Sequence, residues 1–94
     1  MLSNIPIILE KVDPKSIDKE ILRAAIIGEL DAINLYEQMA GLAQNEDVKK
    51  VLLDIAKEEK THVGEFQAVL LRIDPEQARE LLNGKAEVDE MLEK

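Results

Sequence analysis

The sequence of 94 residues contains no cysteine and no tryptophan, and only one phenylalanine, one tyrosine and one histidine. Without cysteine the chain forms no disulfide, offers no thiolate nucleophile and builds no zinc or iron–sulfur site on sulfur. Any bound metal must therefore be held by carboxylate and imidazole groups, which favours iron or manganese. With 46% hydrophobic residues and so few aromatics, an all-α fold with a Leu, Ile, Val and Ala core is predicted.

The sequence also lacks a long apolar run. No segment approaches the roughly 20 apolar residues that cross a membrane. The N-terminus has neither the basic start nor the apolar stretch of a secretory signal, so a cytoplasmic location is expected. The formal net charge of -8 repels nucleic acid and anionic membranes, which we do not expect as partners, and it attracts cations.

Three segments are predicted along the chain, with no strand pattern, low-complexity tract or internal repeat. Residues 1–15 form an N-terminal arm that is broken at Pro14. Ser16 or Asp18 can then cap a first helix from about residue 17 to about residue 44. Because a chain this short buries only about 60% of its unfolded surface, its own core is marginal and a partner chain would stabilise it.

The second segment is a helical hairpin over residues 16–74. The cluster Asn45-Glu46-Asp47 is a turn, and Asp47 is the predicted N-cap of a second helix over residues 48–73. So short a connection makes the two helices antiparallel neighbours.

The third segment is a tail over residues 75–94. Asp74 is predicted to cap a short helix that has proline at its first position and Gln77 completing a capping box. Asn83 and Gly84 are a C-terminal signal and are predicted to end it. Beyond them, one or two more amphipathic turns would depend on a neighbour for their helicity.

Glu59 falls within the apolar stripe of the second helix. The apolar side chains within roughly 40° of Glu59 on a helical wheel are Val48, Leu52, Ile55, Val63, Phe66, Leu70 and Ile73. His62 lies about 60° away on the same stripe and one turn further along. The carboxylate and the imidazole are therefore expected to converge on one point.

Glu29 occupies the same kind of position in the first helix. The residues that surround it within roughly 60° are Leu22, Ala25, Ile26, Ala32, Ile33, Tyr36 and Ala40. A carboxylate in a core stripe is costly unless it is paired, protonated or bound to a cation. Three ionisable groups in two facing stripes therefore need a common explanation.

Two explanations compete for these three groups. In a purely structural one, Glu59 and His62 pair across one turn, and Glu29 is satisfied by Tyr36 or by a neighbouring helix. In the other, the Glu-x-x-His spacing aims two ligands at one metal ion, and Glu29 adds an oxygen from the facing helix. The metal explanation satisfies all three groups at once, so we adopt it.

One chain provides only three ligands. A carboxylate-bridged pair of irons in a four-helix bundle uses two lone Glu residues and two Glu-x-x-His motifs. Two hairpins related by a two-fold axis supply that set. We therefore predict that the hairpin dimerises into a ferritin-like four-helix bundle that holds two irons between the chains.

Three further carboxylates are weaker candidates for a secondary metal site or a path of iron into the centre. Glu58 and Glu65 lie about 70° and 90° from the centre of the stripe of the second helix, where a solvated face is the simpler interpretation. Asp31 lies among apolar residues on the side of the first helix roughly opposite Glu29. That side is a candidate for a second contact between chains.

Residues 24–38 (AAIIGELDAINLYEQ) and 58–62 (EEKTH) resemble rubrerythrin-like members of the ferritin superfamily. They look most like the encapsulated ferritins, and the resemblance covers about residues 16–74. It implies short two-helix chains that pair into a bundle and assemble into a ring of ten. It also implies an encapsulin shell protein, as a partner or as a fused domain, so that the chain would work inside an encapsulin nanocompartment.

The resemblance carries Glu29, Glu59 and His62 over as iron ligands and Tyr36 as the tyrosine beside them. It implies a ferroxidase that oxidises Fe(II) with dioxygen for mineral storage. A rubrerythrin-like peroxidase is an alternative, although such proteins usually add a cysteine-ligated iron domain. A non-catalytic helical scaffold is the alternative from another class.

Overall fold

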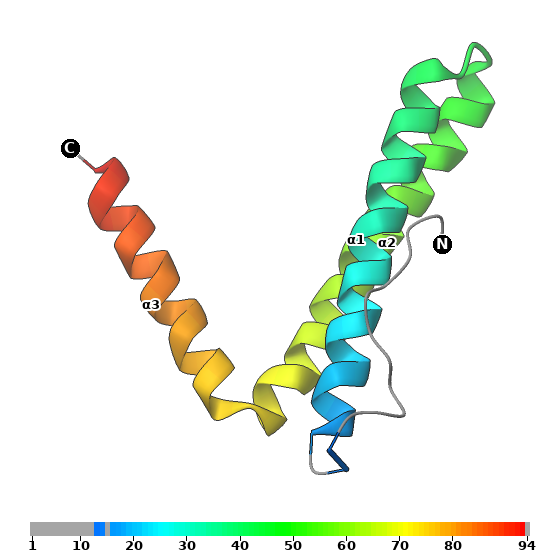
Figure 1. Ribbon diagram of the computed structural model, residues 1–94. Helices are drawn as coiled ribbons and strands as arrows, with labels where there is room; N and C mark the ends of the chain where they lie inside the picture. The colour runs from blue at the N-terminus through cyan, green and yellow to red at the C-terminus, as the bar shows by residue number, and fades with distance from the viewer. Residues whose placement is uncertain (1–12, 15, 94) are drawn as a thin grey trace.

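The computed structural model describes residues 13, 14 and 16–93, so nearly all of the predicted N-terminal arm lies outside the described residues. Within that part the chain forms three helices, α1 (Ile17–Leu42), α2 (Glu46–Ile73) and α3 (Pro75–Leu92), and no strand. The predicted all-α class is confirmed. In Figure 1, α1 and α2 lie side by side as an antiparallel hairpin, and α3 leaves the end of α2 at a wide angle.

The start of α1 agrees with the sequence pattern. The helix begins at Ile17, as predicted, and ends at Leu42, two residues earlier than predicted. Ser16 holds the N-cap position, although its side chain makes no capping hydrogen bond. Its backbone N–H donates instead to the carbonyl of Asp13 at 2.8 Å, which closes a turn ahead of the helix.

The start of α2 differs from the prediction. Asn45, not Asp47, is the N-cap, and its side-chain oxygen accepts from the backbone N–H groups of Asp47 at 2.8 Å and Val48 at 3.1 Å. An Asn at this position satisfies two of the N–H groups that a helix start leaves without partners. Asp47 lies in the first turn instead, where its charge favours the positive end of the helix dipole.

The prediction that the third helix ends at Asn83 and Gly84 is wrong, because α3 continues through both to Leu92. Gly84 does not adopt the positive φ that usually terminates a helix. Local contacts favour continuation, since the Asn83 amide donates to Glu80 at 3.1 Å and Lys85 pairs with Asp89 at 2.6 Å across one turn. The start of α3 follows the prediction, with Asp74 as its N-cap.

The described chain has a small core and a large apolar surface. Its buried hydrophobic residues are Ile33, Ala40, Ala56 and Leu70. Fifteen large hydrophobic side chains in the described part are exposed, and ten of them lie on α1 or α2. The radius of gyration is 16.6 Å, against about 12 Å for a compact domain of this length.

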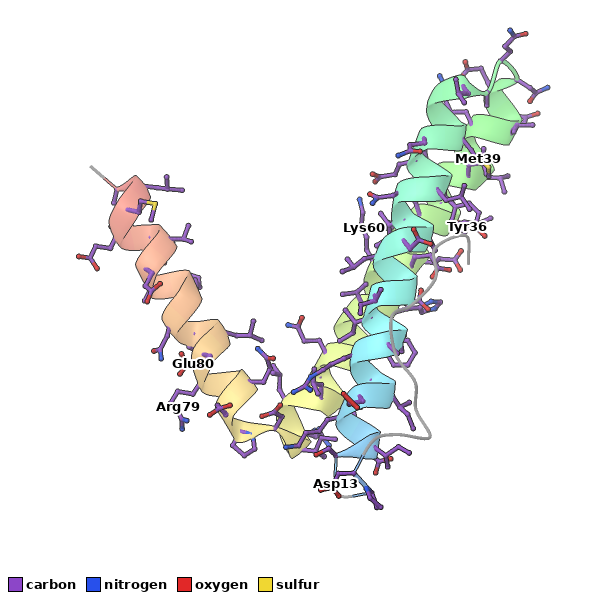
Figure 2. All side chains as sticks on the ribbon, in the orientation of Figure 1. Asp13, Tyr36, Met39, Lys60, Arg79 and Glu80 are labelled. Carbon is purple, nitrogen blue, oxygen red and sulfur yellow. The ribbon has the colours of Figure 1, made fainter. Side chains whose placement is uncertain are left out.

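The third helix carries five of these exposed hydrophobic side chains. No residue of α3 is buried, and Leu82, Met91 and Leu92 are at least 70% exposed. Figure 2 shows Arg79 on the outer side of α3, away from the hairpin. An isolated helix of this length is marginal in water, so this shape calls for a further partner.

Candidate metal centre

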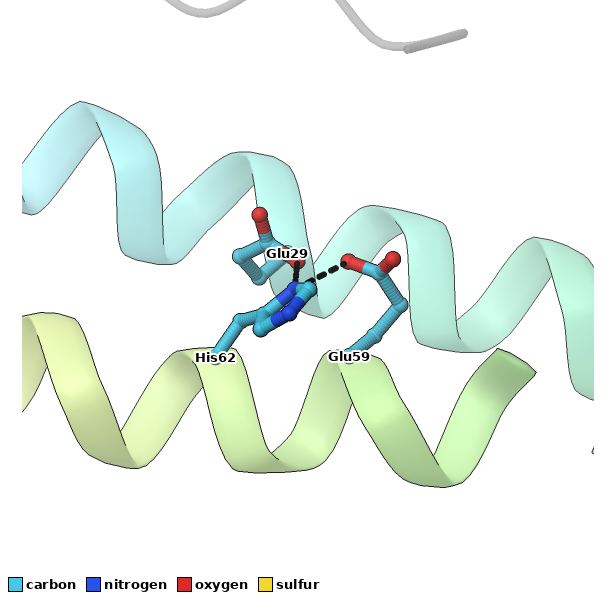
Figure 3. Close-up of side chains that lie close together, drawn as sticks. All are labelled: Glu29, Glu59 and His62. Atoms are coloured by element: carbon cyan, nitrogen blue, oxygen red, sulfur yellow. Dashed lines mark ion pairs between the residues drawn. The ribbon is translucent and has the colours of Figure 1, made fainter. Parts of the chain in front are cut away.

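Glu29, Glu59 and His62 come together midway along the hairpin. Glu29 projects from α1, and Glu59 and His62 project from successive turns of α2 (Figure 3). One ligand atom from each lies within 4.8 Å of the others. It is the only group of three or more potential metal ligands among the described residues. The convergence inferred from the two helical stripes is therefore present within a single chain.

The spacing of these atoms suits a shared ion better than direct hydrogen bonds. Nδ1 of His62 lies 3.4 Å from Oε2 of Glu29 and 3.5 Å from Oε2 of Glu59. Both distances exceed the 2.7–3.2 Å typical of an N–H···O hydrogen bond. Two donors each about 2.1 Å from one ion are about 3.0 Å apart at a right angle and about 3.4 Å apart at a tetrahedral angle.

Glu29 carries the clearest sign that a cation belongs here. Its Oε2 atom is buried and has no hydrogen-bond partner among the described residues. A buried carboxylate oxygen without a donor is costly. The donor set of two carboxylates and an imidazole, without sulfur, fits a metal such as iron.

The centre is open on one side. The side chains of Glu29 and Glu59 are 21% and 19% exposed, and that of His62 is 44% exposed. The two helices therefore enclose the carboxylates while the imidazole reaches the surface. A second chain laid over this face could add ligands to the same centre.

Tyr36 lies on α1 two turns beyond Glu29 and is half-buried. Within the described residues, no hydrogen bond joins it to Glu29, Glu59 or His62. Tyr36 therefore does not satisfy the buried Oε2 atom of Glu29, and the group that faces this atom is His62 of the neighbouring helix, at 3.4 Å.

One contact beside the centre was missed by the sequence reasoning. Lys60 of α2 pairs with Glu37 of α1 at 2.9 Å and ties the two helices together next to Glu59. Figure 2 shows Lys60 and Tyr36 on different sides of the hairpin. The pair joins residues on different helices, so helical periodicity within either one gave no signal for it.

The three weaker candidates do not join this centre. Glu58 and Glu65 are exposed on α2, and Asp31 is half-buried on α1. None of them belongs to a group of three potential ligands in the described part of the chain. A secondary metal site at these residues stays a prediction.

A family model described as Rubrerythrin matches residues 20–93. The chain belongs to the rubrerythrin family. A solved structure titled as the encapsulated ferritin domain from Pyrococcus furiosus is 54% identical to this rubrerythrin-family chain, with a TM-score of 0.84. The match covers 100% of this chain and 98% of that one, which confirms the resemblance to encapsulated ferritins.

Two curated relatives are longer than this rubrerythrin-family chain. A ferritin-like-encapsulin shell fusion protein of Pyrococcus furiosus is 56% identical over 93 residues, which are 97% of this chain but 27% of that protein. Encapsulin nanocompartment cargo protein EncC of Myxococcus xanthus is 41% identical over 70 residues, which are 71% of this chain and 54% of that protein. Among the described residues, no helix is long and apolar enough to cross a membrane.

Proposed function

We propose that the chain is a ferroxidase, which oxidises Fe(II) to Fe(III) with dioxygen at a di-iron centre shared by two copies. The observation that carries the proposal is the cluster of Glu29, Glu59 and His62, with a buried carboxylate oxygen that accepts no hydrogen bond among the described residues. Membership of the rubrerythrin family supports iron as the metal.

Each of the three residues would have a distinct part. Glu29 and His62 would hold an iron as terminal ligands, with Nδ1 of His62 as the ligating nitrogen because it faces both carboxylates. Glu59 would bridge the two irons, since carboxylates bridge metals readily in helical bundles. Each iron gives up one electron, and dioxygen takes up two electrons and two protons to leave as hydrogen peroxide.

The state of His62 makes the activity depend on pH. Only a neutral imidazole has a lone pair for a metal, so protonation in acid competes directly with iron. We therefore expect the rate of oxidation to fall in acid.

A second copy would complete the centre. Three ligands from one chain leave an iron pair short of ligands, and two chains related by a two-fold axis supply six. Large apolar side chains are exposed along the hairpin, among them Leu30 at 50%, Val51 at 59% and Val69 at 49%. These side chains would be covered by the four-helix bundle and by further contacts in a larger ring.

The fate of the oxidised iron is proposed from the relatives. Their names place one in a fusion with an encapsulin shell and the other among encapsulin cargo proteins. We propose that this chain, likewise, supplies Fe(III) for mineral storage inside an encapsulin nanocompartment, with the shell as a separate partner or a fused domain.

A peroxidase is the second candidate, because the matching family model is that of rubrerythrin. In that reaction two Fe(II) ions each give one electron to hydrogen peroxide. The peroxide also takes up two protons and leaves as two molecules of water. The same three ligands would serve either reaction, so the two candidate functions differ in the oxidant that reacts with the iron.

Anaerobic titration with Fe(II), followed by rapid mixing with dioxygen or with hydrogen peroxide, tests both candidates. We expect saturation near one iron per chain and faster oxidation by dioxygen. Faster oxidation by peroxide would favour the peroxidase, and a stoichiometry far from one per chain would sink the shared site. Glu90→Gln, which removes an exposed carboxylate of α3, is the matched control.

A further inference from the structure

Asp74 is the one charged residue that is buried among those described, and it lies at the elbow between α2 and α3. Its exposed fraction is 7%. It is the single non-helical residue between the two helices, and Pro75 follows it. Since proline cannot continue the hydrogen bonding of α2, the chain must turn here.

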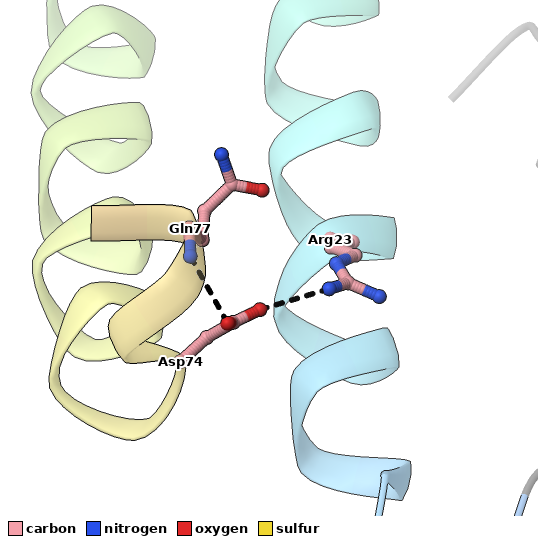
Figure 4. A network of polar contacts seen from close by, with 3 residues as sticks. All are labelled: Arg23, Asp74 and Gln77. Carbon is pink, nitrogen blue, oxygen red and sulfur yellow. Dashed lines mark hydrogen bonds and ion pairs between the residues drawn. The ribbon is translucent and has the colours of Figure 1, made fainter. Parts of the chain in front are cut away.

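The Asp74 side chain joins α3 to α1. Its Oδ1 accepts from the Gln77 backbone N–H at 3.1 Å, which caps α3, and its Oδ2 accepts from Nη2 of Arg23 on α1 at 2.9 Å (Figure 4). Its own N–H donates to the carbonyl of Leu70 on α2 at 2.9 Å. All three helices therefore meet at this one residue.

Packing does little to set the direction of α3. Within the described residues, the backbone of α3 lies close to that of α2 only near the elbow, and it does not come close to α1. An open cleft of about 370 Å³ separates α3 from the hairpin, with Arg23, Leu70, Gln77 and Leu81 among its lining residues. The angle of α3 thus depends on the bonds at the elbow.

We propose that the ion pair between Arg23 and Asp74 is a lock on this elbow, which holds α3 at a set angle to the hairpin and releases it when Asp74 loses its charge. The lock fixes the direction in which α3 presents its exposed apolar residues, including Met91 and Leu92. It does not depend on the proposed iron chemistry.

The charges around the elbow favour the locked state. The pKa of Asp74 is held below its ordinary value of 3.8, first by the hydrogen bond from the Gln77 backbone and then by Lys19 and Arg23, while burial opposes the shift. Both cations belong to α1, α3 contributes the Gln77 N–H, and α2 contributes the Leu70 carbonyl. Because the folded pKa is depressed, the lock holds above the unfolded pKa and opens as the pH falls through the folded one.

Distances between two spin labels test the lock directly, and the absence of cysteine allows specific labelling. Lys57→Cys on α2 and Glu87→Cys on α3 are both exposed positions. Labelled metal-free chain is diluted into unlabelled chain, so that only pairs within one chain are measured. Position 87 lies about 18 Å along α3 from the elbow, so a 20° release would move it by about 6 Å.

At neutral pH we expect one narrow distance distribution for the otherwise unmodified chain. Asp74→Asn, which retains a good capping side chain, and Arg23→Gln, which leaves the cap intact, should both broaden it. Acidification to below the folded pKa of Asp74 should broaden it only where both Arg23 and Asp74 are present. Lys60→Gln, which breaks an ion pair between α1 and α2 away from the elbow, should leave it narrow.

Two results would overturn the lock. One is a distance distribution that stays narrow in both Asp74→Asn and Arg23→Gln. The other is equal broadening in Lys60→Gln, which would indicate that loss of any ion pair between helices loosens the chain. Circular dichroism at 222 nm must accompany the distances, because the proposal requires α3 to move as an intact helix. Loss of helicity in Arg23→Gln would therefore also contradict it.

Discussion

Replacing Glu29 by Gln should stabilise the metal-free chain while removing its response to iron. Oε2 of Glu29 is buried without a hydrogen-bond partner, and the side chain is 21% exposed. An unsatisfied buried polar group costs about 1–3 kcal/mol, and the partial exposure places this carboxylate near the lower end. The amide is neutral and keeps the shape, and the ion pair with His62 that it gives up is long at 3.4 Å and involves a 44% exposed imidazole, so we expect about 1 kcal/mol of added stability.

That gain is measurable by thermal unfolding. In a domain of this size, about 1 kcal/mol raises the Tm by about 4–8 °C. In the native sequence, Fe(II) at 100 times its Kd should add about 2.7 kcal/mol through binding to the folded state alone. In the presence of a chelator, the variant should thus unfold at a higher temperature than the native chain. Under anaerobic Fe(II), it should unfold at a lower temperature than the native chain.

Glu90→Gln makes the same change of charge at an exposed position, and its Tm should stay close to that of the native chain in both conditions. The protein concentration must be equal throughout, because association also raises stability. A lower Tm for metal-free Glu29→Gln, or an undiminished response to Fe(II), would refute the interpretation of Glu29 as a metal ligand whose buried oxygen accepts no hydrogen bond.

Three further outcomes are expected. Glu59→Ala and His62→Ala should each abolish Fe(II) oxidation in stopped-flow absorbance, and full activity in either would remove that residue from the centre. Asn45→Ala should cost about 1 kcal/mol in urea unfolding by removing the cap of α2, and no loss would point to another cap. Gly84→Ala should add about 1 kcal/mol and helicity by circular dichroism, because a Cβ at Gly84 meets open space. A destabilised variant would indicate that a partner packs there.

Much of the hairpin could be predicted because helical periodicity is a local signal. The apolar stripes around Glu29 and Glu59 identified both long helices, and the first residue of α1 agrees with the prediction. The same stripes singled out the three clustered residues, since an ionisable group on an apolar face is visible in sequence. Their roles as iron ligands stay a proposal.

The local errors have a common physical origin. Asn45 and Asp47 are both good caps, and the choice between them depends on which side chain reaches the free N–H groups. Asn83 and Gly84 disfavour a helix by only a fraction of what proline costs. The exposed Lys85–Asp89 pair offsets part of that cost.

The sequence by itself determined the all-α class, the two long helices and the polarity of Glu29, Glu59 and His62 within apolar stripes, because these follow from the spacing of residues along one helix. Only the tertiary structure decided that Glu29 reaches Glu59 and His62, because this depends on the register of α1 against α2. It also decided the bond from Arg23 to Asp74, which joins residues 51 positions apart at the junction of α2 and α3. Contacts between helices depend on their relative placement, which periodicity within one helix does not encode.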